Sequence, residues 1–288
     1  MTALDPPHDA PLLVVDALTK SYRLPGGGSL TAADRVSFTV PRGGSVGIVG
    51  ESGSGKSTVA RMLVGLVPPD AGTVTVNGRD RASRPSALSR HRPAARLERA
   101  REIQMVFQDP YVSLDPRLTA RQCLRTALRL HGHPSTDART QSLLDQVGLG
   151  TREAGARPHQ LSGGQRQRLA IARALAVDPQ ILVLDEAVAA LDVSIQAQIF
   201  QLLGEIRDET GVALVFVSHD LAVVQHITDE TVVMQRGSVV EQGPTERVLG
   251  MPQHPYTRLL LASAPHEGWD PADAIRARAA ADSAQPVV

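Results

Sequence analysis

The stretch from Ser45 to Leu66 constrains the fold of this chain more than any other part of it. An apolar run, SVGIVG, leads directly into GESGSGKST, which fits the pattern G-x-x-x-x-G-K-S/T. Glycines at these positions let the backbone fold tightly around phosphate groups while its amides point inward. The next residues, KSTVARMLVGL, have helical spacing and stop before Pro68 and Pro69. The stretch therefore predicts a buried strand, a phosphate-binding loop and a helix.

The residue types of this loop suit a nucleoside triphosphate. ATP carries roughly four negative charges, so its site must supply amide donors, a cation and a metal ion. Backbone amides at the start of the helix are expected to bind phosphate, helped by the helix dipole, and Lys56 to reach the β- and γ-phosphates. Ser57 is expected to place its hydroxyl on Mg²⁺, and Thr58 to add a second hydroxyl near the phosphates. The loop residues predicted to bind ATP are Gly50, Gly53, Ser54, Gly55, Lys56, Ser57 and Thr58.

Acidic and polar side chains follow three further apolar runs. Asp185 and Glu186 follow ILVL, His219 follows ALVFVS, and Gln108 ends IQMVFQ. The carboxyl ends of parallel strands lie beside such a loop, so Asp185 is expected to hold Mg²⁺ directly or through water. Glu186 is expected to accept a proton from the attacking water. His219 is predicted to contact the γ-phosphate, and Gln108 to offer its amide oxygen to Mg²⁺ or to the water.

Composition narrows the class of protein. The 288 residues are 42% hydrophobic and carry 30 cationic against 30 acidic side chains, so they give no electrostatic reason to expect nucleic acid as a partner. No run approaches the ~18 apolar residues that cross a bilayer, and the first residues lack the features of a signal peptide. Cys123, the only cysteine, excludes an intrachain disulfide and cysteine-rich metal clusters, and it is expected to be a small apolar side chain on a helix.

Periodicity suggests how the remaining chain is organised. Residues 12–40 contain alternating segments typical of antiparallel strands, and GTVTVNG ends in the hairpin signal Asn-Gly. Residues 79–101 are rich in arginine, which predicts a solvated loop and helix, with a nucleic-acid surface as the alternative. Helical patterns dominate residues 119–177. Strand–helix units are expected around ILVLDE, ALVFVSH and TVVMQRG.

A further motif, LSGGQ at residues 161–165, lies between the loop and the acidic pair. With it the chain resembles the ATP-binding subunit of an ABC transporter. The resemblance implies an α/β fold, a P-loop NTPase (RecA-like) core with an antiparallel β subdomain and an inserted α-helical subdomain. It implies one cassette over residues 11–265, with the helical subdomain at about 110–177. Residues 1–10 and 266–288 are expected to be a flexible N-terminus and a flexible tail.

The resemblance also assigns roles to particular residues. In this family the LSGGQ segment binds the γ-phosphate of an ATP molecule that a second ATPase subunit holds. Tyr22 matches the aromatic residue that stacks on adenine, and Asp192 lies in a segment that resembles the D-loop near the dimer interface. Residues 110–117 are expected where the helical subdomain meets the membrane subunits. The residues that resemble the signature are Ser162, Gly163, Gly164 and Gln165.

Four segments narrow the resemblance to the importers of dipeptides, oligopeptides and nickel: QDPYVSLDPR, SHDLAVVQHI, VVEQGPTERVL and PQHPYTRLLLASAP. HPYTRLLL, residues 254–261, is the most diagnostic of them. The resemblance implies a subunit that binds and hydrolyses ATP to power import, first of all of dipeptides or oligopeptides. Nickel or glutathione import is the alternative within this subgroup, and a soluble ABC-type protein without a transport role is the alternative outside it.

The resemblance further implies ATP and Mg²⁺ as cofactors, with Ser57, Gln108 and Asp185 as the metal-binding residues. The implied partners are two transmembrane permease subunits, a second ATPase subunit in a homo- or heterodimer, and indirectly an extracytoplasmic solute-binding protein. The expected location is the cytoplasmic face of the cell membrane. Two positions depart from the family pattern, because Ala187 replaces a common Pro and Ala189 a common Ser. Loss of that hydroxyl is expected to weaken communication between the two ATP sites.

Overall fold

The computed structural model describes residues 10–81 and 93–263. The chain divides into two compact units. Unit 1 takes the described residues within 1–40, 44–82 and 216–288, and unit 2 those within 41–43 and 83–215. The two termini expected to be flexible lie outside the described residues, apart from Ala10.

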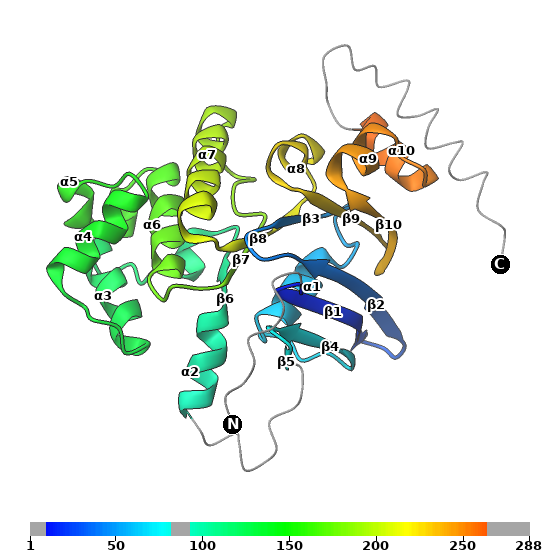
Figure 1. Ribbon diagram of the computed structural model, residues 1–288, viewed down its shortest axis with the longest axis horizontal. Helices are drawn as coiled ribbons and strands as arrows, with labels where there is room; N and C mark the ends of the chain where they lie inside the picture. Colours follow the sequence, from blue (N-terminus) through cyan, green and yellow to red (C-terminus); the bar gives the residue numbers. More distant parts are fainter. Residues whose placement is uncertain (1–9, 82–92, 264–288) are drawn as a thin grey trace. The chain divides into compact units, whose positions relative to one another are not determined.

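Unit 1 combines an antiparallel sheet with a second group of strands and the helices that follow them (Figure 1). Its strands are β1 (Leu13–Arg23), β2 (Ser29–Val40), β3 (Ser45–Val49), β4 (Ala71–Val76), β5 (Arg79–Asp80), β9 (Glu230–Gln235) and β10 (Ser238–Pro244). Its helices are α1 (Lys56–Leu63), α8 (Leu221–Ile227), α9 (Thr245–Gly250) and α10 (Pro255–Ser263).

The antiparallel sheet has the strand order β2-β1-β4-β5. Leu13 of β1 lies opposite Val76 of β4, and both are fully buried. Alternation in β4 buries Val74 and Val76 on one face, as the period of a strand requires. Asn77 and Gly78 have φ angles of 50° and 72°, which suit the tight turn between β4 and β5. The predicted antiparallel strands and hairpin are confirmed.

The phosphate loop follows β3, whose five residues are all buried. Strand β3 runs parallel to β9, with Val49 opposite Val233, and β10 returns antiparallel to β9. The prediction of a strand–helix unit at TVVMQRG is therefore wrong. Arg236 and Gly237, with φ angles of 48° and 88°, form a tight turn, so a second strand precedes α9.

Unit 2 contains a parallel strand pair and most of the helices. Its elements are α2 (Pro93–Glu102), β6 (Ile103–Val106), η2 (Pro110–Val112), α3 (Ala120–Leu130), α4 (Asp137–Gln146), α5 (Thr151–Ala154), η3 (Pro158–Gln160), α6 (Gly163–Leu175), β7 (Ile181–Asp185) and α7 (Val193–Thr210). Strand β6 pairs in parallel with β7, with Ile103 opposite Ile181. Strand β8 (Ala213–Ser218) crosses the division between the units.

Helices α3, α4, α5 and α6 lie together in unit 2 (Figure 1). Their starts are fixed by polar side chains, and the Thr119 hydroxyl accepts a hydrogen bond from the backbone N–H of Gln122 (3.3 Å). Cys123 is buried on α3, as predicted, and burial raises the pKa of its thiol. Their leucines fill the space between these helices, with Leu124, Leu128, Leu143, Leu144 and Leu169 fully buried. The helices fit the expected subdomain, whose limits at about 110–177 stay a prediction.

The predicted α/β class is confirmed, with an antiparallel sheet, parallel strands and a run of helices in one chain. Across residues 10–81 and 93–263, no helix has both the length and the apolar character required to cross a bilayer.

Candidate functional site

The phosphate loop joins β3 to α1, and its glycines hold backbone angles that other residues rarely adopt. Gly50, Gly53 and Gly55 have φ angles of 152°, 82° and 103°. A Cβ at Gly55 would collide with the carbonyl oxygen of Ala32. One at Gly50 would collide with the carbonyl oxygen of Met234. Glycine is therefore required at both positions by conformation and by the close approach of neighbouring backbone.

Lys56 begins α1 and is 3% exposed. Its ammonium donates hydrogen bonds to the carbonyl oxygens of Gly50 (2.7 Å) and Glu51 (2.8 Å). The cation is thereby held within the loop. A phosphate oxygen is charged and forms a stronger bond with an ammonium than a neutral carbonyl does, so it can compete for this group.

Ser54 carries a buried hydroxyl that has no hydrogen-bond partner among the residues the structure describes. A buried polar group left unpaired costs about 1–3 kcal/mol, and a bound phosphate is one group that can supply the missing partner. Ser57 and Thr58 are partly buried at the start of α1. The glycine-lined turn, the enclosed ammonium and the unpaired hydroxyl together fit the triphosphate predicted from the sequence.

Tyr22 and His219 belong to the same unit as the loop. Tyr22 lies near the end of β1 with 38% of its surface exposed, and the Lys20 ammonium is 5.7 Å from the centre of its ring. His219 directly follows β8 and is exposed. The Ser218 hydroxyl accepts a hydrogen bond from the backbone N–H of Asp220 (2.9 Å), which fixes the turn that carries His219. Their roles toward adenine and the γ-phosphate stay predictions.

Asp185 and Glu186 lie in unit 2, at the end of β7. Asp185 is the last residue of this buried strand and is 7% exposed. Glu186 follows with a φ angle of 48°, an uncommon conformation for a residue with a side chain and one that is enriched at functional sites. The predicted placement of two acids after a buried parallel strand therefore agrees with the structure.

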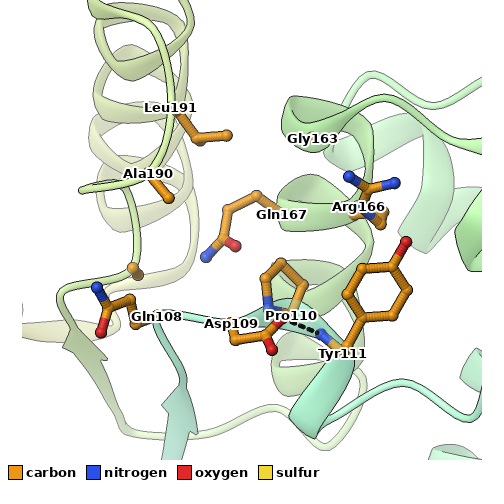
Figure 2. Close-up of a pocket in the computed structure, with 10 residues that line it drawn as sticks. Gln108, Asp109, Pro110, Tyr111, Gly163, Arg166, Gln167, Ala190 and Leu191 are labelled. Carbon is orange, nitrogen blue, oxygen red and sulfur yellow. Dashed lines mark hydrogen bonds between the residues drawn. The ribbon is translucent and has the colours of Figure 1, made fainter.

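Gln108 lies in the loop after β6 and not at the end of a strand, because β6 stops at Val106. It lines a cavity of about 340 Å³ within unit 2 (Figure 2). The predicted site residues Gln108 and Gly163 thus face the same cavity. The lining consists of Gln108, Asp109, Pro110, Tyr111, Gly163, Arg166, Gln167, Ala187, Ala190 and Leu191.

Two side chains of α6, Arg166 and Gln167, add polar groups to this cavity, and neither was predicted. The Arg166 guanidinium lies 4.9 Å from the centre of the Tyr111 ring and donates to the carbonyl oxygen of Leu161 (2.7 Å). The Gln167 side chain is 1% exposed, and its amide nitrogen has no hydrogen-bond partner in the described part of the chain. Figure 2 shows this amide directed toward the space between Gln108 and Ala190. It can donate a hydrogen bond to a group that enters the cavity.

The LSGGQ segment forms the start of α6. The Ser162 hydroxyl accepts a hydrogen bond from the Gln165 backbone N–H (3.2 Å), and the Gln165 side chain accepts one from the Ser162 N–H (3.0 Å). This reciprocal pair is a capping box. A Cβ on Gly164 would lie 2.7 Å from Cγ2 of Ile195 on α7. The glycine therefore has a packing reason, beside the phosphate contact that the sequence predicted.

The segment between β7 and α7 carries both departures from the family pattern. Ala187 is 5% exposed and lines the cavity of unit 2, whereas Ala189 is exposed. Asp192 is the exposed residue that precedes α7, and its side chain makes no capping hydrogen bond. Its predicted place near a dimer interface stays a prediction.

One residue that contacts the phosphate loop was missed. The hydroxyl of Tyr256 accepts a hydrogen bond from the backbone N–H of Glu51 (3.0 Å), although the two residues are 205 positions apart. The motif HPYTRLLL indicated a subgroup of proteins, but its sequence carries no signal for a contact with the loop. No pattern of spacing reports a contact of this range.

The predicted site residues fall into two sets, one in each unit. The unit 1 set consists of the loop Gly50 to Thr58, Tyr22 and His219. The unit 2 set consists of Gln108, Asp185, Glu186 and the four signature residues Ser162, Gly163, Gly164 and Gln165.

Known proteins share these features in sequence. The profile of the ABC transporter family matches residues 33–189, and that of the oligopeptide/dipeptide transporter C-terminal region matches residues 240–285. The chain is 47% identical over 264 residues to the probable peptide ABC transporter ATP-binding protein y4tS of Sinorhizobium fredii, which covers 88% of this chain and 72% of that protein. It is 42% identical over 269 residues to the glutathione import ATP-binding protein GsiA of Pectobacterium atrosepticum, which covers 90% of this chain and 42% of that protein.

Solved structures of ATP-binding cassettes have a fold similar to that of this chain. The dimeric structure of a post-hydrolysis state of the ATP-binding cassette MJ0796, bound to ADP and Pi, aligns with a TM-score of 0.70 and 29% identity. The alignment covers 81% of this chain and 98% of that one. On the family profile, the relatives and the shared cassette fold, the chain belongs to the ABC transporter family.

Proposed function

We propose that this chain is the ATP-hydrolysing subunit of an importer of dipeptides or oligopeptides. The observation that carries the ATPase part is the enclosed Lys56 ammonium, 2.7 and 2.8 Å from two carbonyl oxygens of a glycine-shaped loop. The observation that carries the substrate class is the match of residues 240–285 to the oligopeptide/dipeptide transporter C-terminal region.

In the proposed binding mode, the triphosphate replaces the loop carbonyls as the partner of Lys56. The amides of Gly53 to Gly55 donate to the phosphates, since N–H groups at the start of a helix and the helix dipole both favour an anion at this point. The exposed ring of Tyr22 stacks on adenine. The unpaired Ser54 hydroxyl gains a hydrogen-bond partner when phosphate is bound.

In the proposed reaction, Glu186 accepts a proton from a water molecule as the water oxygen bonds to the γ-phosphorus. The bond from the γ-phosphorus to the bridging oxygen breaks, and ADP leaves with the electron pair. His219 contacts the γ-phosphate and orients it, and Gln108 orients the water. Ser57, Gln108 and Asp185 supply the hydroxyl, amide and carboxylate oxygens that Mg²⁺ prefers. When bound, Mg²⁺ neutralises charge on the phosphates.

The proposed active form is a dimer of two ATPase subunits. Each ATP lies between the phosphate loop of one subunit and Ser162, Gly163, Gly164 and Gln165 of the other. A dimer is the form of the related cassette MJ0796 bound to ADP and Pi. Binding of ATP favours the closed dimer, and hydrolysis removes the γ-phosphate that joins the two subunits. The second subunit is either another copy of this chain or a different ATPase subunit.

The proposed partners in the membrane are two permease subunits, with the chain on the cytoplasmic face. Residues 110–117 are proposed to meet these subunits. Tyr111 is 44% exposed and Val112 is 67% exposed, which is the character of a contact surface. A solute-binding protein outside the membrane would deliver the substrate and act on this chain only indirectly.

Glutathione import is the second candidate function. The relative GsiA of Pectobacterium atrosepticum is named a glutathione import ATP-binding protein, and glutathione is itself a short peptide. The choice between these substrates lies with subunits other than this one. ATPase assays of the assembled transporter with dipeptides, oligopeptides and glutathione would separate the two.

The test of the ATPase proposal compares two variants. Glu186→Gln should bind ATP, hydrolyse it about 10²–10⁴-fold more slowly and accumulate as a dimer, because only the proton acceptor is lost. Lys56→Ala should lose ATP binding. Nucleotide titration, ATPase assays and size-exclusion chromatography measure these outcomes. Normal turnover by Glu186→Gln, or unchanged affinity of Lys56→Ala, would contradict the assigned roles.

A further inference from the structure

The contact between Tyr256 and the phosphate loop links the C-terminal segment to the predicted ATP site within unit 1. The Tyr256 side chain is 4% exposed, and its hydroxyl accepts the Glu51 backbone N–H at 3.0 Å. Glu51 is the second residue of the loop. A backbone group of the loop is thus held by a side chain from the motif HPYTRLLL, which none of the proposed steps uses.

The turn that presents Tyr256 is itself held by β10. The Glu241 carboxylate accepts hydrogen bonds from the backbone N–H groups of Gln253 (2.9 Å) and His254 (3.0 Å). The His254 ring nitrogen Nδ1 in turn accepts the Tyr256 N–H (3.2 Å). These bonds fix the backbone immediately before and at the start of α10.

Arg258 supports the same turn from the helix side. Its guanidinium donates to the carbonyl oxygens of Pro252 (3.0 Å) and Gln253 (3.2 Å). His254, Tyr256 and Arg258 of the HPYTR motif therefore have one shared effect. They hold the start of α10 in a single arrangement, from which the Tyr256 hydroxyl reaches the loop.

The Tyr256 ring also belongs to the core beside the loop. It packs in a buried cluster with Val49, the last residue of β3, and with side chains from α8, β9 and α9. The hydroxyl is therefore carried by a ring that cannot move without disturbing this core. Burial also raises the pKa of the phenol, so the group stays protonated and neutral at physiological pH.

Besides the local hydrogen bond that the Ser54 N–H donates to the Glu51 carbonyl oxygen (3.2 Å), two side chains hold the loop backbone around Glu51. Tyr256 accepts the N–H of Glu51, and Lys56 donates to the carbonyl oxygens of Glu51 and of the preceding Gly50. ATP binding is expected to draw Lys56 toward phosphate, which leaves Tyr256 as the remaining one of these contacts. A loop already held in its binding shape loses less conformational freedom when the ligand arrives.

We propose that Tyr256 is a positioning residue for ATP, and that the HPYTR segment braces the phosphate loop through the backbone N–H of Glu51. This inference rests on the proposed function, because it assigns the C-terminal segment a role in the affinity of the same ATP site. Tyr256 does not touch ATP in this assignment. It acts through the shape of residues 50 and 51.

The test is Tyr256→Phe in the full chain, which removes the acceptor oxygen and keeps the ring in the core. Loss of one such hydrogen bond should raise the Kd for ATP about fivefold. Hydrogen–deuterium exchange of the peptide that contains Glu51 should become faster in the nucleotide-free protein. In the assembled transporter, KM for ATP should rise while kcat at saturating ATP stays within about twofold.

The matched control is Thr231→Val. It also deletes one buried hydroxyl of unit 1, which lies 2.9 Å from the Thr245 hydroxyl, but it leaves the loop contact in place. This control should lower thermal stability without changing the Kd or the exchange of the loop. A wild-type Kd for ATP and wild-type loop exchange in Tyr256→Phe would contradict the proposed role of Tyr256. Equal changes in Kd and loop exchange in Tyr256→Phe and Thr231→Val would contradict it as well. Failure of the unaltered chain to bind ATP would instead contradict the proposed function, and with it any role in ATP affinity.

Discussion

The phosphate loop and the LSGGQ segment are both rich in glycine and both precede a helix, but their glycines answer different physical demands. Gly50 and Gly55 have positive φ angles and lie against backbone carbonyls. Gly164 lies within helix α6, and a side chain there would meet Ile195. In one segment glycine permits a backbone shape. In the other it permits a neighbouring helix to come close.

The two segments also differ in how they are supported. The capping box of the signature joins Ser162 and Gln165, which are three positions apart. The loop is held by Tyr256, 205 positions from its partner, and by a hydrogen bond from the Gly237 N–H to the carbonyl oxygen of Ser54 (3.0 Å). Local support can form as the helix forms, whereas the loop needs the folded unit around it.

Alanine substitutions at Gly55 and at Gly164 should show the largest difference between the two segments, measured in the free energy of unfolding. Gly55→Ala combines a strained φ with a collision against backbone, which should cost about 3 kcal/mol in the free energy of unfolding. Gly164→Ala meets only a side chain and gains helix propensity, so the net cost should be about 1 kcal/mol. Urea unfolding of both variants, each checked for ATP binding, measures the difference.

A double variant shows whether Ile195 is the reason for the second cost. Gly164→Ala should be less destabilising in an Ile195→Ala background, since the obstructing side chain is gone. The same background should not relieve Gly55→Ala. Equal costs for the two glycines, or no coupling between Gly164 and Ile195, would break the comparison.

One serine from each segment, Ser54 and Ser162, sharpens the comparison further. Ser162→Ala removes a helix cap and should lower the free energy of unfolding by about 1 kcal/mol, while Ser162→Asp should keep most of it. Ser54→Ala deletes a buried hydroxyl without a partner among the described residues, so the free energy of unfolding of the nucleotide-free chain should rise by about 1 kcal/mol. Thermal unfolding without nucleotide compares them, and a larger loss for Ser54→Ala than for Ser162→Ala would reverse the expected order.

The sequence predicted what depends on local pattern. The glycine spacing, the apolar run of β3 and the helical spacing after Lys56 place a strand, loop and helix correctly, because each signal acts over a few residues. Asp185 at the end of β7 follows from the same logic. Gln108 was placed at the end of a strand that in fact stops at Val106, since the apolar Phe107 continues the run beyond the last strand pairing.

Most of what the sequence did not predict depends on contacts between distant residues. The pairing of β10 with β9 is the exception, because it is a local hairpin with Ser238 opposite Gln235, and it was missed because the segment TVVMQRG ends before β10 begins. Gln167 lies on a helix with an ordinary apolar pattern, and only the fold shows that its amide borders a cavity. The contact of Tyr256 with Glu51 likewise joins residues far apart in the sequence, so only the fold shows it.

The smallest expected effect tests whether this distant support depends on a charged group. Burial by itself would raise the pKa of Glu241, but hydrogen bonds, including those from the backbone N–H groups of Gln253 and His254, lower it below the usual 4.5. A carboxyl group whose pKa is lower in the folded chain stabilises the fold at pH values above its pKa in the unfolded chain. This contribution is lost as the pH falls through the pKa of the folded state. Glu241→Gln should therefore lower the free energy of unfolding by about 0.5 kcal/mol at pH 7, allowing for screening by solvent.

This difference from wild type should shrink as the pH falls below 4.5, the usual value for Glu241. Glu246→Gln on α9 is the matched control, because Glu246 is exposed and none of the hydrogen bonds of the C-terminal turn involves it. Chemical unfolding at several pH values measures both variants. A pH-independent cost, or the same cost in the control, would mean that the turn before α10 holds its shape without the Glu241 charge. The phosphate loop would then depend on the remote segment through packing and the Tyr256 hydroxyl alone.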